Sequence, residues 1–154
     1  MPRIYTCEFE NIAVTTAVDM FIFDPAAERP IELIGLFISQ HTEVTTNVGR
    51  DEFMRMRIIR GHTTAGTGTS ATPVPIEPID VAAGFTCVTN ATTSTAGTAV
   101  NVHSEAWNVR TGFGMIWPAD SGPQTTGTSL LVVRLMAAPS ESISFSGTTY
   151  IREL

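Results

Sequence analysis

The sequence of 154 residues contains no lysine, and all nine of its basic residues are arginine. The absence of lysine excludes catalysis through a lysine Schiff base and phosphate binding by a P-loop lysine. Charged residues make up only 16% of the chain, with a formal net charge of −6. Nucleic acid requires a clustered basic face, so we expect no direct contact with nucleic acid.

Long apolar runs and a signal-peptide pattern are also missing. The chain begins MPRIYTCEFE, and no stretch approaches 18 consecutive apolar residues. We therefore expect synthesis in a cytoplasm and no membrane span.

Cysteine is scarce as well. Cys7 and Cys87 each alternate with an aromatic residue on an expected strand, which predicts two buried free thiols. A disulfide would form only if the fold brought them together.

The residues that usually bind metals are few and scattered. His41, His62 and His103 do not stand at metal-ligand spacing with one another, with cysteine or with an acid. The sequence therefore predicts no metal site and no cofactor.

Catalytic motifs are equally hard to find. GHTTAGT, from Gly61, has the glycine spacing of a P-loop, but Thr67 stands where that motif has lysine. The Gly-x-Ser-x-Gly pattern of a nucleophile elbow does not occur. Glu8 and Glu10 share a strand face, but nothing marks them as a glycosidase pair rather than a solvated edge. We expect a protein that is not an enzyme.

Threonine, glycine and proline are abundant, at 23, 12 and 9 residues. Threonine favours strands, and the other two favour turns. Short apolar segments separated by turn residues predict an all-β protein. Strands are expected at residues 3–9, 15–23, 31–39, 53–60, 84–90, 98–109, 113–117, 130–136 and 143–154. Eight to ten strands in a single domain of residues 1–154 suit a β-sandwich, in particular a jelly-roll-like one.

Two expected strands, ELIGLFI and LLVVRLM, are apolar on both faces. In the second, Leu131, Val133 and Leu135 share one face, and other apolar residues occupy the opposite face. A simple sandwich strand has one polar face, so something must cover the second face. The cover is either a segment of the same chain or another subunit. We interpret it as a sign of a homo-oligomer, a dimer or trimer, and count these three residues as candidate contacts.

Residues 61–80 form a long stretch rich in threonine, glycine and proline. Loops of this length are usually functional or disordered, so we predict a contact arm that a partner orders. Proline in such an arm limits the entropy lost on ordering and discourages stray strand pairing. The candidate contact residues in the arm are Thr63, Thr64, Thr67, Thr69, Pro73, Val74, Pro75 and Ile76.

Two further pairs are candidate contacts. Arg55 and Arg57 share a strand face and could clamp a carboxylate of a partner, although cross-strand ion pairs would explain them equally well. Trp107 and Trp117 could line a sugar-binding face or anchor an interface. Core packing of at least one of them is the ordinary alternative.

The segments MPRIYTCEFENIAV, RIIRGHTTAGTGTSATP, AAGFT and LLVVRLMAAPSESISFSGTTYIREL resemble a group of small proteins encoded in the head-morphogenesis regions of tailed phages and prophages. The resemblance extends over most of the chain. It implies a capsid decoration or cement protein with a β-sandwich or jelly-roll fold, made in the host cytoplasm. Such a protein binds the outer surface of the phage head as an oligomer and stabilises contacts between copies of the major capsid protein.

The resemblance assigns no role to any single residue. Two other functions stay open at this point. One is a carbohydrate-binding or adhesion module of a tail or fibre, which requires an exposed Trp107 or Trp117. The other is a small β-fold enzyme, for which the sequence offers no group of catalytic residues.

Overall fold

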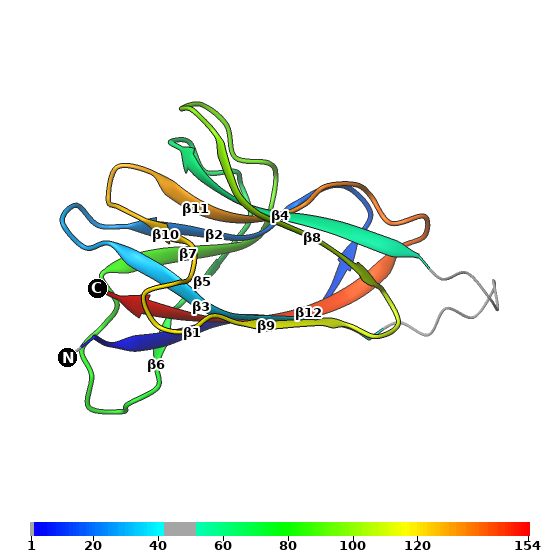
Figure 1. The fold of residues 1–154 in the computed structure, drawn as a ribbon. Helices are drawn as coiled ribbons and strands as arrows, with labels where there is room; N and C mark the ends of the chain where they lie inside the picture. Colours follow the sequence, from blue (N-terminus) through cyan, green and yellow to red (C-terminus); the bar gives the residue numbers. More distant parts are fainter. Residues whose placement is uncertain (1, 42–51) are drawn as a thin grey trace.

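The computed structural model describes residues 2–41 and 52–154. Over these residues the protein is all β, as predicted, and has twelve strands and no helix (Figure 1). The strands are β1 (Ile4–Val14), β2 (Asp19–Pro25), β3 (Ile31–Gln40), β4 (Phe53–His62), β5 (Thr69–Ala71), β6 (Val74–Pro75), β7 (Phe85–Ala91), β8 (Val100–Asn108), β9 (Phe113–Ile116), β10 (Gln124–Thr125), β11 (Leu130–Leu135) and β12 (Ile143–Glu153). Accordingly, this part of the chain offers no helix that is long and apolar enough to cross a membrane.

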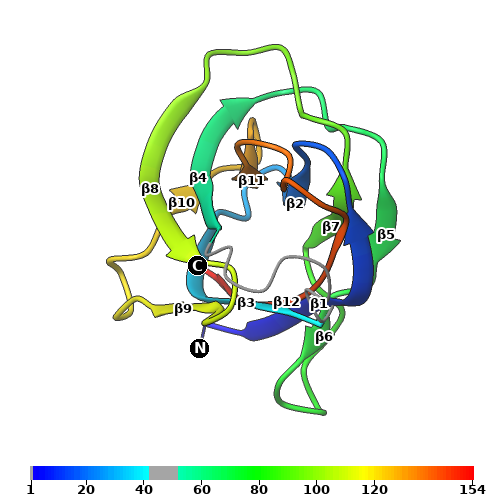
Figure 2. The same cartoon turned by 90° about the vertical axis from the view of Figure 1, so that its right-hand side faces the viewer.

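Two antiparallel sheets form a β-sandwich. The first has the order β10-β3-β12-β1-β6, and β9 also pairs with β3. The second has the order β5-β7-β2-β11-β4-β8. Viewed from one end, the sheets enclose the core between them, with β8 near β9 on one side and β5 near β6 on the other (Figure 2). The β8–β9 connection passes from the second sheet to the first on one of these sides, and the β5–β6 connection does so on the other.

The core arises from the alternation that the sequence predicts. Along β1, Tyr5, Cys7 and Phe9 are buried, whereas Glu8 and Glu10 are exposed. Successive side chains of a strand point to opposite faces, so this pattern places one face of β1 against the second sheet.

The two cysteines meet in this core as buried free thiols, as predicted. Two residues before each cysteine, Tyr5 packs edge-on against Phe85, with ring centroids 5.7 Å apart. Strands β1 and β7 therefore bring Cys7 and Cys87 together. A hydrogen bond with Cys7 raises the pKa of the Cys87 thiol, and burial raises it further. The protonated thiol is a poor nucleophile, so the fold keeps Cys87 unreactive.

We expect Ellman's reagent to label the folded protein at least about 100-fold more slowly than the urea-unfolded chain, because labelling requires an exposed thiolate. The chain has only these two cysteines, so complete reaction releases two equivalents of the coloured thiolate. Labelling of the folded protein at the rate of the unfolded chain would contradict the burial of the pair.

Gly147 of β12 leaves room for two aromatic rings of the core. A Cβ at this position would lie 2.8 Å from Phe9 Cε1 and 3.0 Å from Phe21 Cε2. We expect Gly147→Ala to lower the free energy of unfolding by about 1–3 kcal/mol, because both rings must shift inside a packed core. Urea unfolding measures the change. Gly114→Ala is the matched control, since it meets only the partly exposed Phe37 ring.

The doubly apolar strand β11 is covered on both faces by the chain itself. Leu131, Val133 and Leu135 are buried in the main core between the sheets. Leu130 and Val132 are buried in a second cluster on the opposite face of β11. The interpretation that another subunit covers this strand is therefore wrong, and the alternative of a cover from the same chain holds.

Strand β3 is covered less completely on its outer face. Phe37 is 38% exposed, and its ring stands edge-on to Tyr150 of β12 at a centroid distance of 6.1 Å. Ile34 is half-buried. A small apolar area of the first sheet therefore remains accessible.

The predicted arm of residues 61–80 is ordered largely by its own chain. Strand β5 pairs with β7 at the edge of the second sheet, and β6 pairs with β1 at the edge of the first. The arm thus crosses from one sheet to the other and closes one side of the sandwich (Figure 2). Ordering of this stretch therefore does not require a partner, because two strand edges provide hydrogen-bond partners within the molecule. Whether the arm also contacts a partner stays a prediction.

Candidate docking surface

The last part of the arm forms a loop between β6 and β7 that projects beside the N-terminus (Figure 1). Both ends of this loop are held by β1. At one end the Ile76 N–H donates to Ile4 O at 2.9 Å. At the other end the Tyr5 hydroxyl donates to Val81 O at 3.0 Å. The loop is therefore a fixed projection of the fold.

Ionisable groups near Tyr5 favour the hydrogen bond by which its hydroxyl holds the loop at Val81 O. Burial raises the pKa of the Tyr5 phenol, and the carboxylate of Glu153 raises it further. The hydroxyl consequently keeps the proton that it donates to Val81 O. Arg3 and Asp80 add an ion pair at 3.6 Å, in which both side chains are partly exposed.

The anchored loop and the adjoining strand β6 present four apolar side chains to solvent. Ile79 is 90% exposed, and its three companions are about half exposed. We call this set the arm tip, and it consists of Val74, Ile76, Ile79 and Val81. Isolated exposed apolar residues are ordinary, but here four lie within eight consecutive residues. Ile76 and Ile79 line one groove together with Arg3 and Ile4, and Val74 lines a separate groove beside β1.

The threonines predicted as contacts lie on the first half of the arm. Thr63, Thr64, Thr67 and Thr69 are all exposed. The backbone of this half is nevertheless engaged, because Thr64 forms a bridge with Thr95 and the Thr67 N–H donates to the Thr92 hydroxyl at 2.9 Å. The side chains of these threonines are thus exposed on a segment whose backbone is ordered. Pro73 and Pro75, which follow them, are half-buried.

Four of the predicted contact residues are placed wrongly. Leu131, Val133 and Leu135 have no exposed surface, and Trp107 is buried against Phe113 at a ring distance of 5.8 Å. They cannot contact a partner without opening the core. For the three residues of β11, the prediction failed because the apolar residues on both faces of the strand are covered by the chain itself. Leu131, Val133 and Leu135 face the main core between the sheets.

The other candidates remain accessible. Trp117 is half-buried and stands edge-on to His103, with ring centroids 5.8 Å apart. Arg55 is exposed and Arg57 half-buried on the outer face of β4. Neither arginine forms an ion pair with any residue that the structure describes. Within residues 2–41 and 52–154, the ordinary explanation by cross-strand ion pairs has no support.

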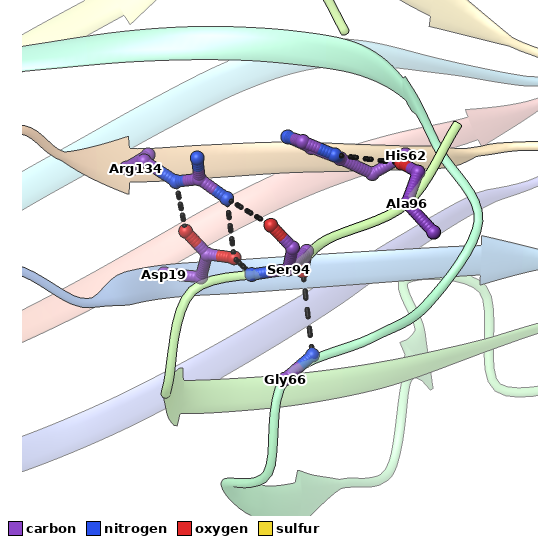
Figure 3. Close-up of polar contacts among 6 residues, drawn as sticks. All are labelled: Asp19, His62, Gly66, Ser94, Ala96 and Arg134. Carbon is purple, nitrogen blue, oxygen red and sulfur yellow. Dashed lines mark hydrogen bonds and ion pairs between the residues drawn. The ribbon is translucent and has the colours of Figure 1, made fainter. Parts of the chain in front are cut away.

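The sequence analysis missed a buried polar network on the outer face of the second sheet (Figure 3). Asp19 is fully buried and accepts two bonds from Arg134, at 2.5 Å from Nε and 3.1 Å from Nη2. The Ser94 N–H donates to the same carboxylate at 2.5 Å, and Arg134 Nη2 donates to Ser94 O at 2.9 Å. The β7–β8 loop is thereby fastened over β2 and β11.

Two further bonds extend this network to the arm. The Gly66 N–H donates to the Ser94 hydroxyl at 3.4 Å. The His62 Nδ1–H donates to Ala96 O at 3.1 Å, and His62 is buried (Figure 3). The network holds the cover of β11 in place, so we assign it a structural role.

No group of three or more histidine, cysteine or acidic residues in the described ranges could hold a metal ion. His41 and His103 lie apart from the buried His62, on other elements. Glu8 and Glu10 line an open groove with Thr69 and other arm residues.

No protein-family model, curated protein or solved structure matched this chain. The resemblance to head-morphogenesis proteins thus remains a prediction from the quoted segments. The geometry adds a loop that is hydrogen-bonded to β1 at both ends and carries exposed apolar side chains.

Proposed function

We propose that this chain is a virion structural protein that decorates the outer surface of a tailed-phage head and docks on the major capsid protein through the arm tip. The observation that carries the proposal is the 90% exposure of Ile79 on a loop fixed to β1 at both ends. A preformed loop loses little conformational entropy when it binds, so one of the costs that oppose its apolar contacts is small.

Docking through the arm tip would stabilise the head because the same contact is repeated over the capsid. Burying one exposed isoleucine or valine contributes up to about 1.5–3 kcal/mol, so four such side chains give each copy a modest affinity. The lattice symmetry of a capsid repeats this contact many times. Many copies that bridge neighbouring capsid proteins would resist the outward pressure of packaged DNA.

A homo-oligomer is part of the proposal. Strand β8 is an edge strand of nine residues, and β4 is its only partner among the strands that the structure describes. Its side chains Val100 and Val102 are exposed. Unpaired edges of this kind can pair with another copy. Analytical ultracentrifugation of the purified protein decides between a monomer and a dimer or trimer.

The alternative function, carbohydrate binding by a tail or fibre module, requires an open tryptophan face. Trp107 is buried and Trp117 is half-buried. No observation in the described residues favours this alternative over docking.

The proposal is tested by mixing purified protein with expanded heads that lack it and sedimenting the heads. Saturable co-sedimentation at a fixed number of copies per head is the expected result. A protein that stays in the supernatant at micromolar concentration, and that binds glycans on an array, would replace the proposal with the adhesion alternative.

A further inference from the structure

A hollow of about 680 Å³ lies next to the arm tip, where the two ends of the described chain meet. It shares Pro2 and Arg3 with the groove under the arm. Its lining residues are Pro2, Arg3, Arg29, Asp120, Arg152, Glu153 and Leu154. Three of the nine arginines in a chain with a net charge of −6 thus converge on this one place. We call it the arginine hollow.

The arginines of the hollow retain free donor capacity. Arg152 is buried, and its Nη2 contacts Glu32 at 2.6 Å and also Asp120, but its buried Nε has no hydrogen-bond partner. Arg29 is exposed and forms no ion pair within the described residues. A guanidinium has five N–H donors in a planar fork, which matches a carboxylate.

The acids of the hollow are already engaged in different ways. Glu153 accepts a hydrogen bond from the Gly84 N–H. Asp120 has an 82% exposed side chain and a left-handed backbone with φ of 66°, and its carboxylate contacts Arg152. An exposed carboxylate is therefore held by an arginine at the mouth of the hollow.

We infer that the arginine hollow binds a carboxylate side chain from an acidic peptide segment that lies alongside the arm tip. The inference rests on the proposed function, and it specifies the chemistry of the docking partner: an apolar patch next to at least one aspartate or glutamate. Arg29 would make the main contact because it is exposed and has no ion-pair partner among residues 2–41 and 52–154. Arg152, which already pairs with Glu32 and Asp120, would add its positive charge to the hollow.

A capped hexaglutamate peptide is the probe, and isothermal titration calorimetry measures its affinity. We expect saturable binding that Arg29→Gln weakens about fivefold, the size of one charge-assisted contact at a partly exposed site. Arg60→Gln is the matched control. Arg60 is an exposed arginine of β4 without an ion pair in the described residues, and it is not among the lining residues of the hollow. Its loss should leave the affinity unchanged.

A second variant moves Arg29 without changing charge. A Cβ at Gly84 would lie 2.4 Å from Arg29 Cδ, so Gly84→Ala should displace Arg29 and weaken peptide binding as well. Equal effects of Arg29→Gln and Arg60→Gln, or no saturable binding, would overturn the inference. The assay contains no heads, so its failure leaves the docking proposal standing, and failure to bind heads leaves the peptide result standing.

Discussion

Asp19→Asn is expected to lower the free energy of unfolding by about 3–5 kcal/mol. The substitution removes the charge that faces Arg134 and leaves the guanidinium in a largely buried place without its counter-charge. Arg134 is only 15% exposed, and Asp19 has no exposed surface. The loss would take a large part of the total stability of a domain of this size, which is about 5–15 kcal/mol. Urea unfolding followed by circular dichroism measures it.

Asp120→Asn is the matched control, because this aspartate also pairs with an arginine but is 82% exposed. We expect its stability to stay within about 1 kcal/mol of the wild type. The double variant Asp19→Asn with Arg134→Met should be more stable than Asp19→Asn alone, since no unpaired charge remains buried. A small effect of Asp19→Asn would show that the network does not hold the cover of β11.

Ile79→Asp is expected to reduce binding to expanded heads at least about tenfold. Under the proposed function, the side chain leaves water on docking, and an aspartate there would bring an unpaired charge into the contact. Ile79 is 90% exposed in the free protein, so the fold should tolerate the change. Co-sedimentation with heads gives the affinity, and thermal unfolding confirms that the variant is folded.

The control is Ile116→Asp, which replaces another exposed isoleucine. Ile116 is 72% exposed and lies on β9, which pairs with β3, whereas the arm tip lies beside β1. Binding should persist in this variant. Equal losses for the two variants would mean that apolar surface in general, and not the arm tip, attaches the protein.

Much of the fold can be predicted from the alternation of side chains. The nine expected segments correspond to β1–β4, β7–β9, β11 and β12. The three strands that were missed, β5, β6 and β10, have two or three residues each. Such short strands have no period of their own. They exist because a longer neighbouring strand offers an unpaired edge.

The arrangement of polar contacts could not be predicted, because it depends on residues far apart in the sequence. Asp19 and Arg134 are 115 positions apart and meet only through the pairing of β2 with β11. A signal was nevertheless present. Arg134 is the single charged residue of β11, and Asp19 begins the apolar run DMFIF of β2. Buried charges need a partner. That pattern indicates a buried pair, but it does not indicate which loop the pair holds.

The candidate docking surface could also be predicted only in part from the sequence. The sequence singled out Val74 and Ile76 within the arm, and both belong to the arm tip. Ile79 was not singled out, because its exposure depends on how Tyr5 and Ile4 hold the loop. The burial of Leu131, Val133 and Leu135 depends on which face of β11 meets the other sheet. Periodicity separates the two faces but does not say how each is covered.

A cryo-electron microscopy map of the assembled particle tests the central claim most directly. The account predicts density for this β-sandwich on the outer surface of the head, with the arm tip and the adjacent arginine hollow turned toward the major capsid protein. Density on a tail or fibre, or a sandwich on the head with Ile79 facing solvent, would contradict it.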